Sequence, residues 1–366
     1  MKKILFRVSL LIILLTAGLL AFIFHSSNSY AIRIKTKATC YITLKFDKQE
    51  HSPIITKNTL IKIDSGTTVQ QIASILVKKG IVKQDDQKYF TCLLAKDEIA
   101  PNIKAGYFIL KQDQLKTLNQ LAKKLTNPEN AVLNITIPDG LRYDQELYLL
   151  QKNLNNEFSK FKSTEFTKLV KQPSLFRKQY SFIPTNAKTL EGFLFPDTYQ
   201  VNIFETTAKD IIIKMLDAFE KKALPVLNSK DCKTTDLSMY QRLILASILE
   251  RETNPQLYER QVVADILLKR LRSNMHLQVD TALLYEKKDW SYELTYQDLH
   301  TDHEYNTYTR IGLPVGPISN PSLLSMKATC SPIKNDYWYF LHDKQGKIHY
   351  SKTYQEHLIY VDKYLR

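Results

Sequence analysis

The segment YQRLILASILERETNPQLYERQVVADILLKRLR, Tyr240–Arg272, is the stretch around which the chain is organised. Its apolar residues recur at helical spacing, and Asn254-Pro255 interrupts the pattern. The segment therefore predicts two packed helices with a break between them. The first helix contains an unbroken run of apolar and small residues, Leu243–Leu249, that ends abruptly at Glu250.

Glu250 is the residue that we predict to be catalytic. A carboxyl group at the end of such a run either emerges into water or lies in a partly dry cleft. A dry cleft raises its pKa, which makes the group a proton donor near neutral pH. We expect the dry cleft, although by spacing alone an exposed helix-end carboxylate is more common. Arg251 and Glu252 are expected to form a solvated pair or to support the catalytic group.

Glu250 and Glu252 are not expected to act together as acid and nucleophile. Residues two apart on a helix point roughly 200° apart around its axis. A retaining glycosidase instead needs two carboxyl groups about 5 Å apart. The pattern therefore favours a site with one carboxyl group in the substrate groove.

A second unusual stretch is LEGFLFPDTY, Leu190–Tyr199, in which aromatic residues, Gly and Pro stand beside two carboxylates. This composition is typical of a groove in which sugar rings stack on aromatic side chains while carboxylates bind sugar hydroxyls. We therefore expect substrate contacts from Glu191, Phe195 and Asp197. The alternative is a buried corner in which Glu191 or Asp197 caps backbone amides.

The segment Tyr305–Pro321 is rich in Pro and Gly and has no regular periodicity. Such a composition fixes the backbone without helix or strand, which suits a loop that lines a substrate site. We expect Asn306 and Tyr308 to hydrogen-bond a sugar N-acetyl group or to steady the catalytic carboxyl. Closing the loop on itself is the alternative role for both residues.

The formal net charge of +14 suggests an anionic partner. The basic residues are spread along the chain without a dense Arg and aromatic patch, so no nucleic acid is expected as a partner. The cysteines lie far apart and no His cluster accompanies them, which excludes the usual zinc spacings. We predict no metal and no other cofactor. One or two disulfides would suit an oxidising compartment, with the pairing left open for Cys40, Cys92, Cys232 and Cys330.

Residues 4–24 form an apolar run long enough to cross a bilayer, which takes about 20 residues. A cleaved signal peptide is the alternative, but Ser29-Tyr30-Ala31 is a poor cleavage site. We expect residues 1–30 to be a cytoplasmic tail and a single-pass anchor in the inner (cytoplasmic) membrane. Lys2 and Lys3 then stay inside by the positive-inside rule, and the C-terminal domain lies on the extracytoplasmic (periplasmic) side.

The expected fold class is α+β, with the transmembrane helix, a small module over residues 31–140 and a larger mixed domain over residues 141–366. In the small module, Ala38–Leu44 and Thr59–Ile63 alternate as strands do. Two helices and the strand Gly106–Leu110 follow. This strand–helix–helix–strand order resembles a LysM-like module, which lies along glycan chains. A packing domain without a ligand is the alternative.

Across roughly residues 60–365 the chain resembles the YceG-like endolytic murein transglycosylases. The resemblance rests on the order and spacing of LEGFLFPDTY, ASILERET, LQVDTALLY, YNTYTRIGLPVGPISNPS and the strand YWYF. It implies a lyase that cleaves the β-1,4 bond between N-acetylmuramic acid and N-acetylglucosamine in nascent peptidoglycan. The product is a 1,6-anhydromuramic end, and cleavage limits strand length. The resemblance places the catalytic glutamate at Glu250 and Tyr308 beside it.

The chain also departs from the family pattern. Asp139 stands where the family usually shows Glu, and Val315 replaces the second Pro of a Leu-Pro-Pro-Gly loop. We assign no function to Asp139. The expected partners are peptidoglycan glycan strands, the inner membrane through residues 4–24, and peptidoglycan synthases. The alternatives are a muramidase that uses water and a non-catalytic scaffold that binds peptidoglycan.

Overall fold

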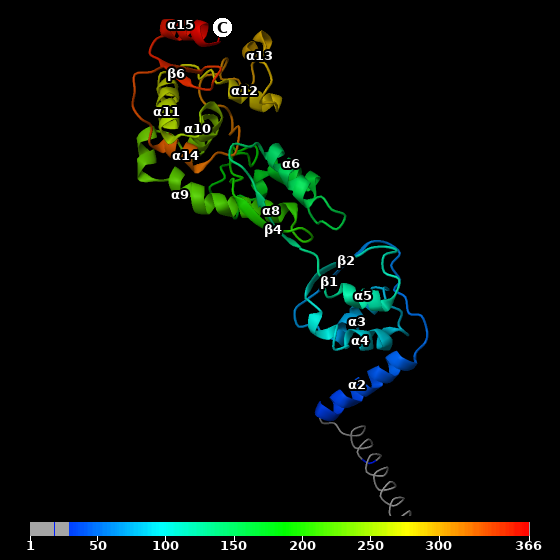
Figure 1. Cartoon of the computed structure of the whole chain (residues 1–366). Helices are drawn as coiled ribbons and strands as arrows, with labels where there is room; N and C mark the ends of the chain where they lie inside the picture. Colours follow the sequence, from blue (N-terminus) through cyan, green and yellow to red (C-terminus); the bar gives the residue numbers. More distant parts are fainter. Residues whose placement is uncertain (1–17, 19–28, 366) are drawn as a thin grey trace, which may run out of the picture. The chain divides into compact units, whose positions relative to one another are not determined.

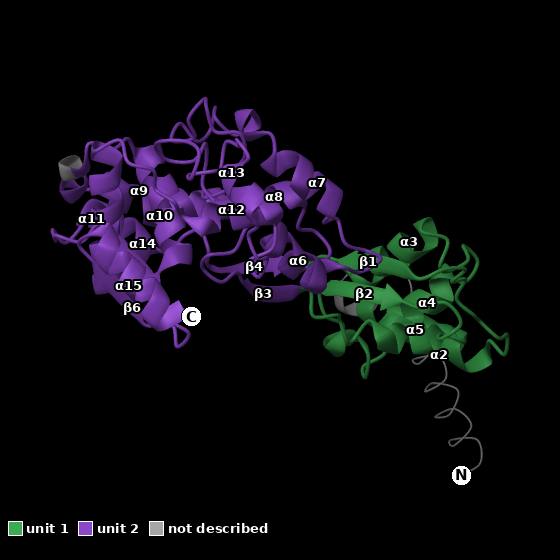
Figure 2. Ribbon diagram, turned by 90° about the horizontal axis from the view of Figure 1, so that it is seen from above, with its two compact units in different colours: residues 1–131 green, residues 132–366 purple. Residues whose placement is uncertain are grey.

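The computed structural model describes Gly18 and residues 29–365. It divides the chain into two compact units, residues 1–131 and residues 132–366 (Figure 2). The boundary comes earlier than predicted because strand β3 (Val132–Thr136) pairs antiparallel with β4 (Thr198–Asn202) and so belongs to the second unit.

The predicted membrane anchor, residues 4–24, lies outside the described residues except for Gly18. Among the residues that are described, none of the helices combines the length and the apolar character that a bilayer span requires. The anchor therefore stays a prediction from the sequence.

Unit 1 is built on a two-stranded antiparallel sheet, β1 (Thr59–Ile63) with β2 (Gly106–Leu110). Between these strands run α3 (Val69–Lys78) and α4 (Gln87–Leu94), followed after β2 by α5 (Leu118–Lys124) (Figure 1). Thr68 caps α3 in a reciprocal bond with Gln71. This confirms the predicted order of strand, helix, helix and strand.

The segment before β1 is a helix, α2 (Ser29–Phe46), so the strand predicted over Ala38–Leu44 is wrong. Cys40 forms a disulfide with Cys92 in α4, and Leu44 packs on the core of unit 1. Residues four apart share one face of a helix, so helical geometry brings both side chains to the unit at once. These contacts outweigh the β-propensity of the segment, which is itself strongly dependent on context.

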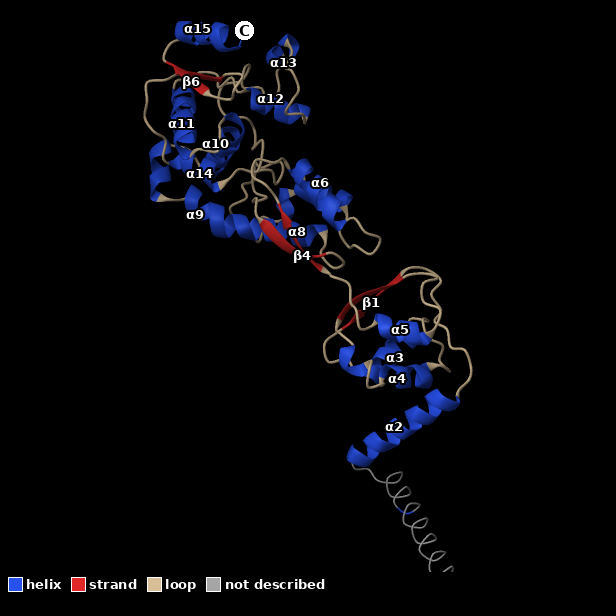
Figure 3. Ribbon diagram, in the orientation of Figure 1, coloured by secondary structure: helices blue, strands red, loops and turns tan. Residues whose placement is uncertain are grey.

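The core of unit 2 contains three packed helices, α10 (Met239–Glu252), α11 (Leu257–Arg272) and α14 (Leu323–Cys330) (Figures 1 and 3). Leu243–Leu249 is buried throughout. Ser238 caps the start of α10, and the chain turns extended at Thr253 before α11 begins. The predicted pair of packed helices is confirmed.

After α14, unit 2 continues with a β-hairpin and a last helix. The hairpin pairs β5 (Tyr339–His342) with β6 (Ile348–Ser351), and α15 (Tyr354–Leu365) follows it. Among the described residues, unit 1 also contains η1 (Ala100–Asn102). The other elements described in unit 2 are α6 (Tyr143–Leu154), α7 (Ser163–Val170), η2 (Pro173–Leu175), α8 (Ala208–Ala218), the π-helical turn η3 (Phe219–Ala223), α9 (Leu224–Leu227), η4 (Lys230–Thr235), α12 (Asp280–Lys287) and α13 (Tyr296–His300).

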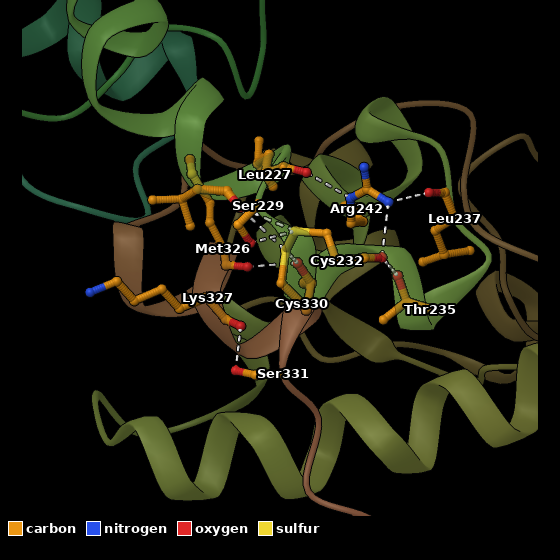
Figure 4. The surroundings of a disulfide bond; sticks show 12 residues. Leu227, Ser229, Cys232, Thr235, Leu237, Arg242, Met326, Lys327, Cys330 and Ser331 are labelled. Carbon is orange, nitrogen blue, oxygen red and sulfur yellow. Dashed lines mark hydrogen bonds between the residues drawn. A yellow bond between two sulfur atoms is a disulfide. The ribbon is translucent and has the colours of Figure 1, made fainter.

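A second disulfide, Cys232–Cys330, ties η4 to the last residue of α14 (Figure 4). Beside it the buried Arg242 guanidinium donates from Nε to the carbonyl oxygen of Leu227 at 3.0 Å, and from Nη1 to that of Leu237. The disulfide and Arg242 together fix the segment that leads into α10. All four cysteines are paired, two within each unit.

Candidate active site

Glu250 lies near the end of α10 and is surrounded by hydrogen-bond donors. The Arg260 guanidinium donates to both carboxylate oxygens, at 3.0 and 2.9 Å. The Ser322 amide, the Ser322 hydroxyl and the Ser325 hydroxyl donate to Oε2 at 2.9, 2.6 and 2.8 Å. The side chain is only 8% exposed and that of Arg260 only 3%. Glu250 is therefore a buried ionised group that joins α10, α11 and α14.

The pKa of Glu250 lies below its ordinary value, so the predicted raised pKa is wrong. Burial acts to raise this pKa, but the Ser322 hydroxyl, the Arg260 charge and the other donors outweigh it. Hydrogen bonds and a cation stabilise the charged form of a carboxyl group and so oppose its protonation. Glu250 holds no proton to donate near neutral pH.

Glu252, two residues further on, is the carboxyl group with the opposite behaviour. Burial raises the pKa of Glu252 to about 7. The negative charge of Asp280 also raises this pKa, whereas the hydrogen bond from the Thr281 hydroxyl lowers it. That hydroxyl donates to Oε1 at 2.6 Å. The predicted solvated pair of Arg251 and Glu252 is therefore wrong. A carboxyl group with this pKa is protonated in a large fraction of molecules at neutral pH.

Glu252 lines a pocket of about 500 Å³ at the end of unit 2 that carries the β5–β6 hairpin and α15. Polar, charged and aromatic side chains line the pocket. Its lining includes Glu252, Arg270, Asp280, Tyr308, Tyr339 and His357. A concave site that combines aromatic surface with a few polar groups and a shifted carboxyl pKa is a typical active site.

Tyr308 is the predicted substrate residue that the structure places in this pocket, with Glu252 and not with Glu250 as its neighbour. Its hydroxyl donates to Oδ1 of Asp280, the first residue of α12, at 2.5 Å. Arg270 donates to the carbonyl oxygens of Trp338 and Leu277 at 2.8 and 2.7 Å. These bonds hold the polar side of the pocket in place.

Asn306 closes the loop on itself, which was the alternative interpretation. Its side-chain amide donates to the carbonyl oxygens of Asp298 and Thr301 at 3.1 and 2.8 Å, and its oxygen accepts from the Tyr308 amide at 2.9 Å. The residue is 1% exposed, so substrate cannot reach it. Asn306 contributes to the site by fixing the backbone at Tyr308.

The LEGFLFPDTY stretch is a buried corner and not an open groove. Glu191 is 1% exposed and accepts from the Tyr143 amide at 3.0 Å and from the Asn320 side chain at 2.9 Å. Phe195 is also buried. Asp197 accepts from the Thr198 amide at 2.9 Å and pairs with Lys222. The alternative in which these carboxylates cap backbone amides is confirmed.

The buried carboxyls Glu191 and Glu146 make stability dependent on pH. Burial raises the pKa of Glu191 from 4.5 to about 8 and raises that of Glu146 well above 4.5, with the neighbouring Glu191 charge adding to the second shift. Both pKa values are higher in the folded state than in the unfolded state. The contribution of the two groups to the stability of the folded protein is therefore complete below the unfolded-state pKa and is lost as pH rises through about 8.

We therefore expect the free energy of unfolding to fall between pH 5 and pH 9, by about 4 kcal/mol from Glu191 and by a further amount from Glu146. Urea unfolding at several pH values measures it. The Glu146→Gln variant, which cannot ionise at that position, should show a flatter profile. An equally steep profile in that variant would contradict the assignment to Glu146.

Residues 61–363 match the YceG-like family. The chain is 30% identical over 316 residues to the endolytic murein transglycosylase of Bacillus subtilis (strain 168), covering 83% of this chain and 84% of that protein. It is 28% identical over 323 residues to that of Streptococcus pneumoniae serotype 2 (strain D39), covering 82% of this chain and 57% of that protein. A crystal structure of a YceG-like protein from Listeria monocytogenes is 29% identical with a TM-score of 0.56, covering 83% of this chain and 99% of that chain.

Proposed function

The chain belongs to the YceG-like family, and from this premise we propose that it is an endolytic murein transglycosylase whose proton-transferring group is Glu252. It cleaves peptidoglycan glycan strands at internal bonds. The observation that carries the assignment of Glu252 is its place in the 500 Å³ pocket with a pKa of about 7. The family membership carries the reaction class.

The reaction needs one carboxyl group that first gives and then takes a proton. Glu252 in its acid form protonates the oxygen of the bond between C1 of N-acetylmuramic acid and O4 of N-acetylglucosamine as that bond breaks. The resulting carboxylate accepts the proton of the muramic C6 hydroxyl, and O6 attacks C1. Glu252 regains its proton, a 1,6-anhydro ring forms and no water is consumed.

The intramolecular attack explains why a second catalytic carboxyl group is not required. The C6 hydroxyl belongs to the residue under attack, so a well-oriented conformer lowers the barrier by up to about 7–11 kcal/mol relative to an external nucleophile. Asp280 serves the acid indirectly, because its charge contributes to the raised pKa of Glu252. Tyr308 in turn holds Asp280 through its hydroxyl.

Glu250 is less suited to this chemistry than its place in the sequence suggests. Oε2 of Glu250 accepts four hydrogen bonds and the group is paired with Arg260. Protonation would break this pairing inside the protein, where an unpaired guanidinium is costly. We infer that Glu250 supports the end of α10 that carries Glu252.

Mass spectrometry of fragments from purified glycan strands tests the reaction. We expect internal cleavage with 1,6-anhydromuramic ends, each lighter by one water molecule than a hydrolysed end. Fragments with reducing muramic ends only would show the water-using muramidase instead. Binding of strands without any fragments would show a non-catalytic scaffold.

We infer that both units lie on the extracytoplasmic side of the inner membrane, held by residues 4–24. Two disulfides support this location, since disulfides persist in oxidising compartments and are rare in the cytosol. Peptidoglycan, the proposed substrate, also lies outside. Protease added to intact spheroplasts should digest residues 132–366, and their full protection would contradict the location.

We also propose that unit 1 is a LysM-like module that binds glycan and that peptidoglycan synthases are partners of the enzyme. The β1–α3–α4–β2 order supports the first proposal. A photoreactive glycan probe added to the whole protein should label residues of unit 1 as well as the pocket. Labelling confined to unit 2 would contradict glycan binding by unit 1. Cross-linking in cells tests the second proposal.

A further inference from the structure

The C-terminal helix α15 forms one wall of the pocket that contains Glu252. Tyr354, His357 and Leu358 from this helix line the pocket together with groups from α10, α11 and α12. The helix packs on both strands of the β5–β6 hairpin (Figure 1). The last twelve residues of the described chain therefore contribute side chains to a site whose acid lies more than a hundred positions earlier.

His357 is the titratable imidazole that α15 contributes to the pocket. Its ring stacks on Tyr339, with 5.2 Å between ring centroids and 25° between the planes. The Arg270 guanidinium also packs on the Tyr339 ring, 5.0 Å from its centroid. Stacking of this kind fixes the orientation of the imidazole before any ligand arrives.

Nδ1 of His357 is buried and has no hydrogen-bond partner among the residues that the structure describes. Buried polar atoms without partners are uncommon in native proteins, and a role in a catalytic site is one explanation for such an atom. The nearby His349 differs, because its Nε2 lies 2.8 Å from Oδ2 of Asp343 and its ring stacks on Tyr364. His349 has the contacts of a packing residue, whereas His357 has an unused polar atom.

The charges around His357 favour a neutral imidazole. Burial lowers the pKa of His357, and the positive charge of Arg270 on α11 lowers it further. The pocket also contains Glu252 on α10, Asp280 on α12 and His342 on β5. Near neutral pH the pocket thus places an uncharged imidazole with Glu252, which is protonated in a large fraction of molecules, and a neutral imidazole can both donate and accept a hydrogen bond.

We propose that His357 is a substrate-binding residue, which holds the N-acetylhexosamine next to Glu252 by a hydrogen bond between its imidazole and a hydroxyl or acetamido group of the sugar. This proposal rests on the proposed function. It makes α15 a part of the active site, and Tyr339 a residue that positions His357.

Binding is best measured in the whole protein carrying Glu252→Gln, which stops turnover while the rest of the pocket is kept. Isothermal titration with a tetrasaccharide of alternating N-acetylglucosamine and N-acetylmuramic acid gives the affinity. Adding His357→Phe retains a ring on Tyr339 but removes both nitrogens, and we expect about tenfold weaker binding, the usual range for one neutral hydrogen bond. His357→Gln should recover part of the affinity.

The matched control is His349→Phe, the same substitution at a histidine outside the pocket. It should lower the melting temperature and leave the affinity unchanged. In the Glu252→Gln protein that keeps His357, binding should also weaken as pH falls and the imidazole gains a proton. This pH dependence should vanish when His357→Phe is added. The proposal would be overturned if the proteins with and without His357→Phe bound the tetrasaccharide with equal affinity while thermal melting showed that both are folded.

The same proteins separate this proposal from the assignment of the catalytic acid. With Glu252 intact, His357→Phe should raise KM more than it lowers kcat, while the products keep their anhydro ends. An unchanged KM would again count against His357. Continued cleavage by Glu252→Gln would overturn the role of Glu252 while leaving the affinity comparison at His357 valid.

Discussion

The Glu252→Gln variant is expected to cleave glycan strands about 10²–10⁴-fold more slowly than the unaltered protein, the usual contribution of a positioned acid–base group. Glutamine keeps the size of the side chain and can still bond to Thr281, which donates to Oε1 at 2.6 Å. It cannot give or take the proton that both steps need. The rate of release of soluble anhydromuropeptides measures the loss, and thermal melting shows whether the fold is kept.

The unaltered protein should itself lose activity as pH rises through about 7, because the acid form of Glu252 disappears over that range. Glu250→Gln provides the comparison at a neighbouring carboxyl group. If Glu252→Gln were active and folded, and Glu250→Gln folded but inactive, the catalytic assignment would return to Glu250.

The second large effect is expected at Glu250, and it concerns stability. Glu250→Gln leaves the Arg260 guanidinium buried, with a side chain only 3% exposed, and without its anionic partner. Removal of one member of a buried ion pair typically lowers the free energy of unfolding by about 3–5 kcal/mol. Urea or thermal unfolding measures this loss, and activity per folded molecule should fall much less than in Glu252→Gln.

A double-mutant cycle separates the ion pair from other effects of the substitution. The Glu250→Gln/Arg260→Gln protein should be destabilised by less than the sum of the two single variants, because the unpaired charge is gone. Additive losses would show that the bidentate contact at 2.9 and 3.0 Å contributes little to stability.

The sequence could predict elements with a strong local signal. The break at Asn254-Pro255 correctly separated α10 from α11. The alternation in Ala38–Leu44 failed because a disulfide and packing on unit 1 select a helix there. These contacts come from residues far along the chain, and no local pattern contains them.

Helical periodicity in the sequence could not decide whether Glu250 or Glu252 is the catalytic residue, for a physical reason. Leu243–Leu249 is buried on every side of α10, so no polar face indicates which direction leads to the substrate. The answer depends on partners that arrive from elsewhere, Arg260 for one carboxyl group and Thr281 for the other. A buried corner and a sugar groove likewise have similar composition, and only the tertiary contacts of Glu191 distinguish them.

The disulfide between Cys232 and Cys330 also determines when α14 becomes anchored at both ends. Helix α14 begins at the serines that bind Glu250 and ends at Cys330, so this cross-link anchors the far end of the helix that braces the catalytic region. Disulfide bonds form and persist in oxidising compartments and are rare in the cytosol. If the protein lies outside the membrane, as we propose, a newly made copy in the reducing cytosol lacks this cross-link, and α14 is anchored at Cys330 only after export.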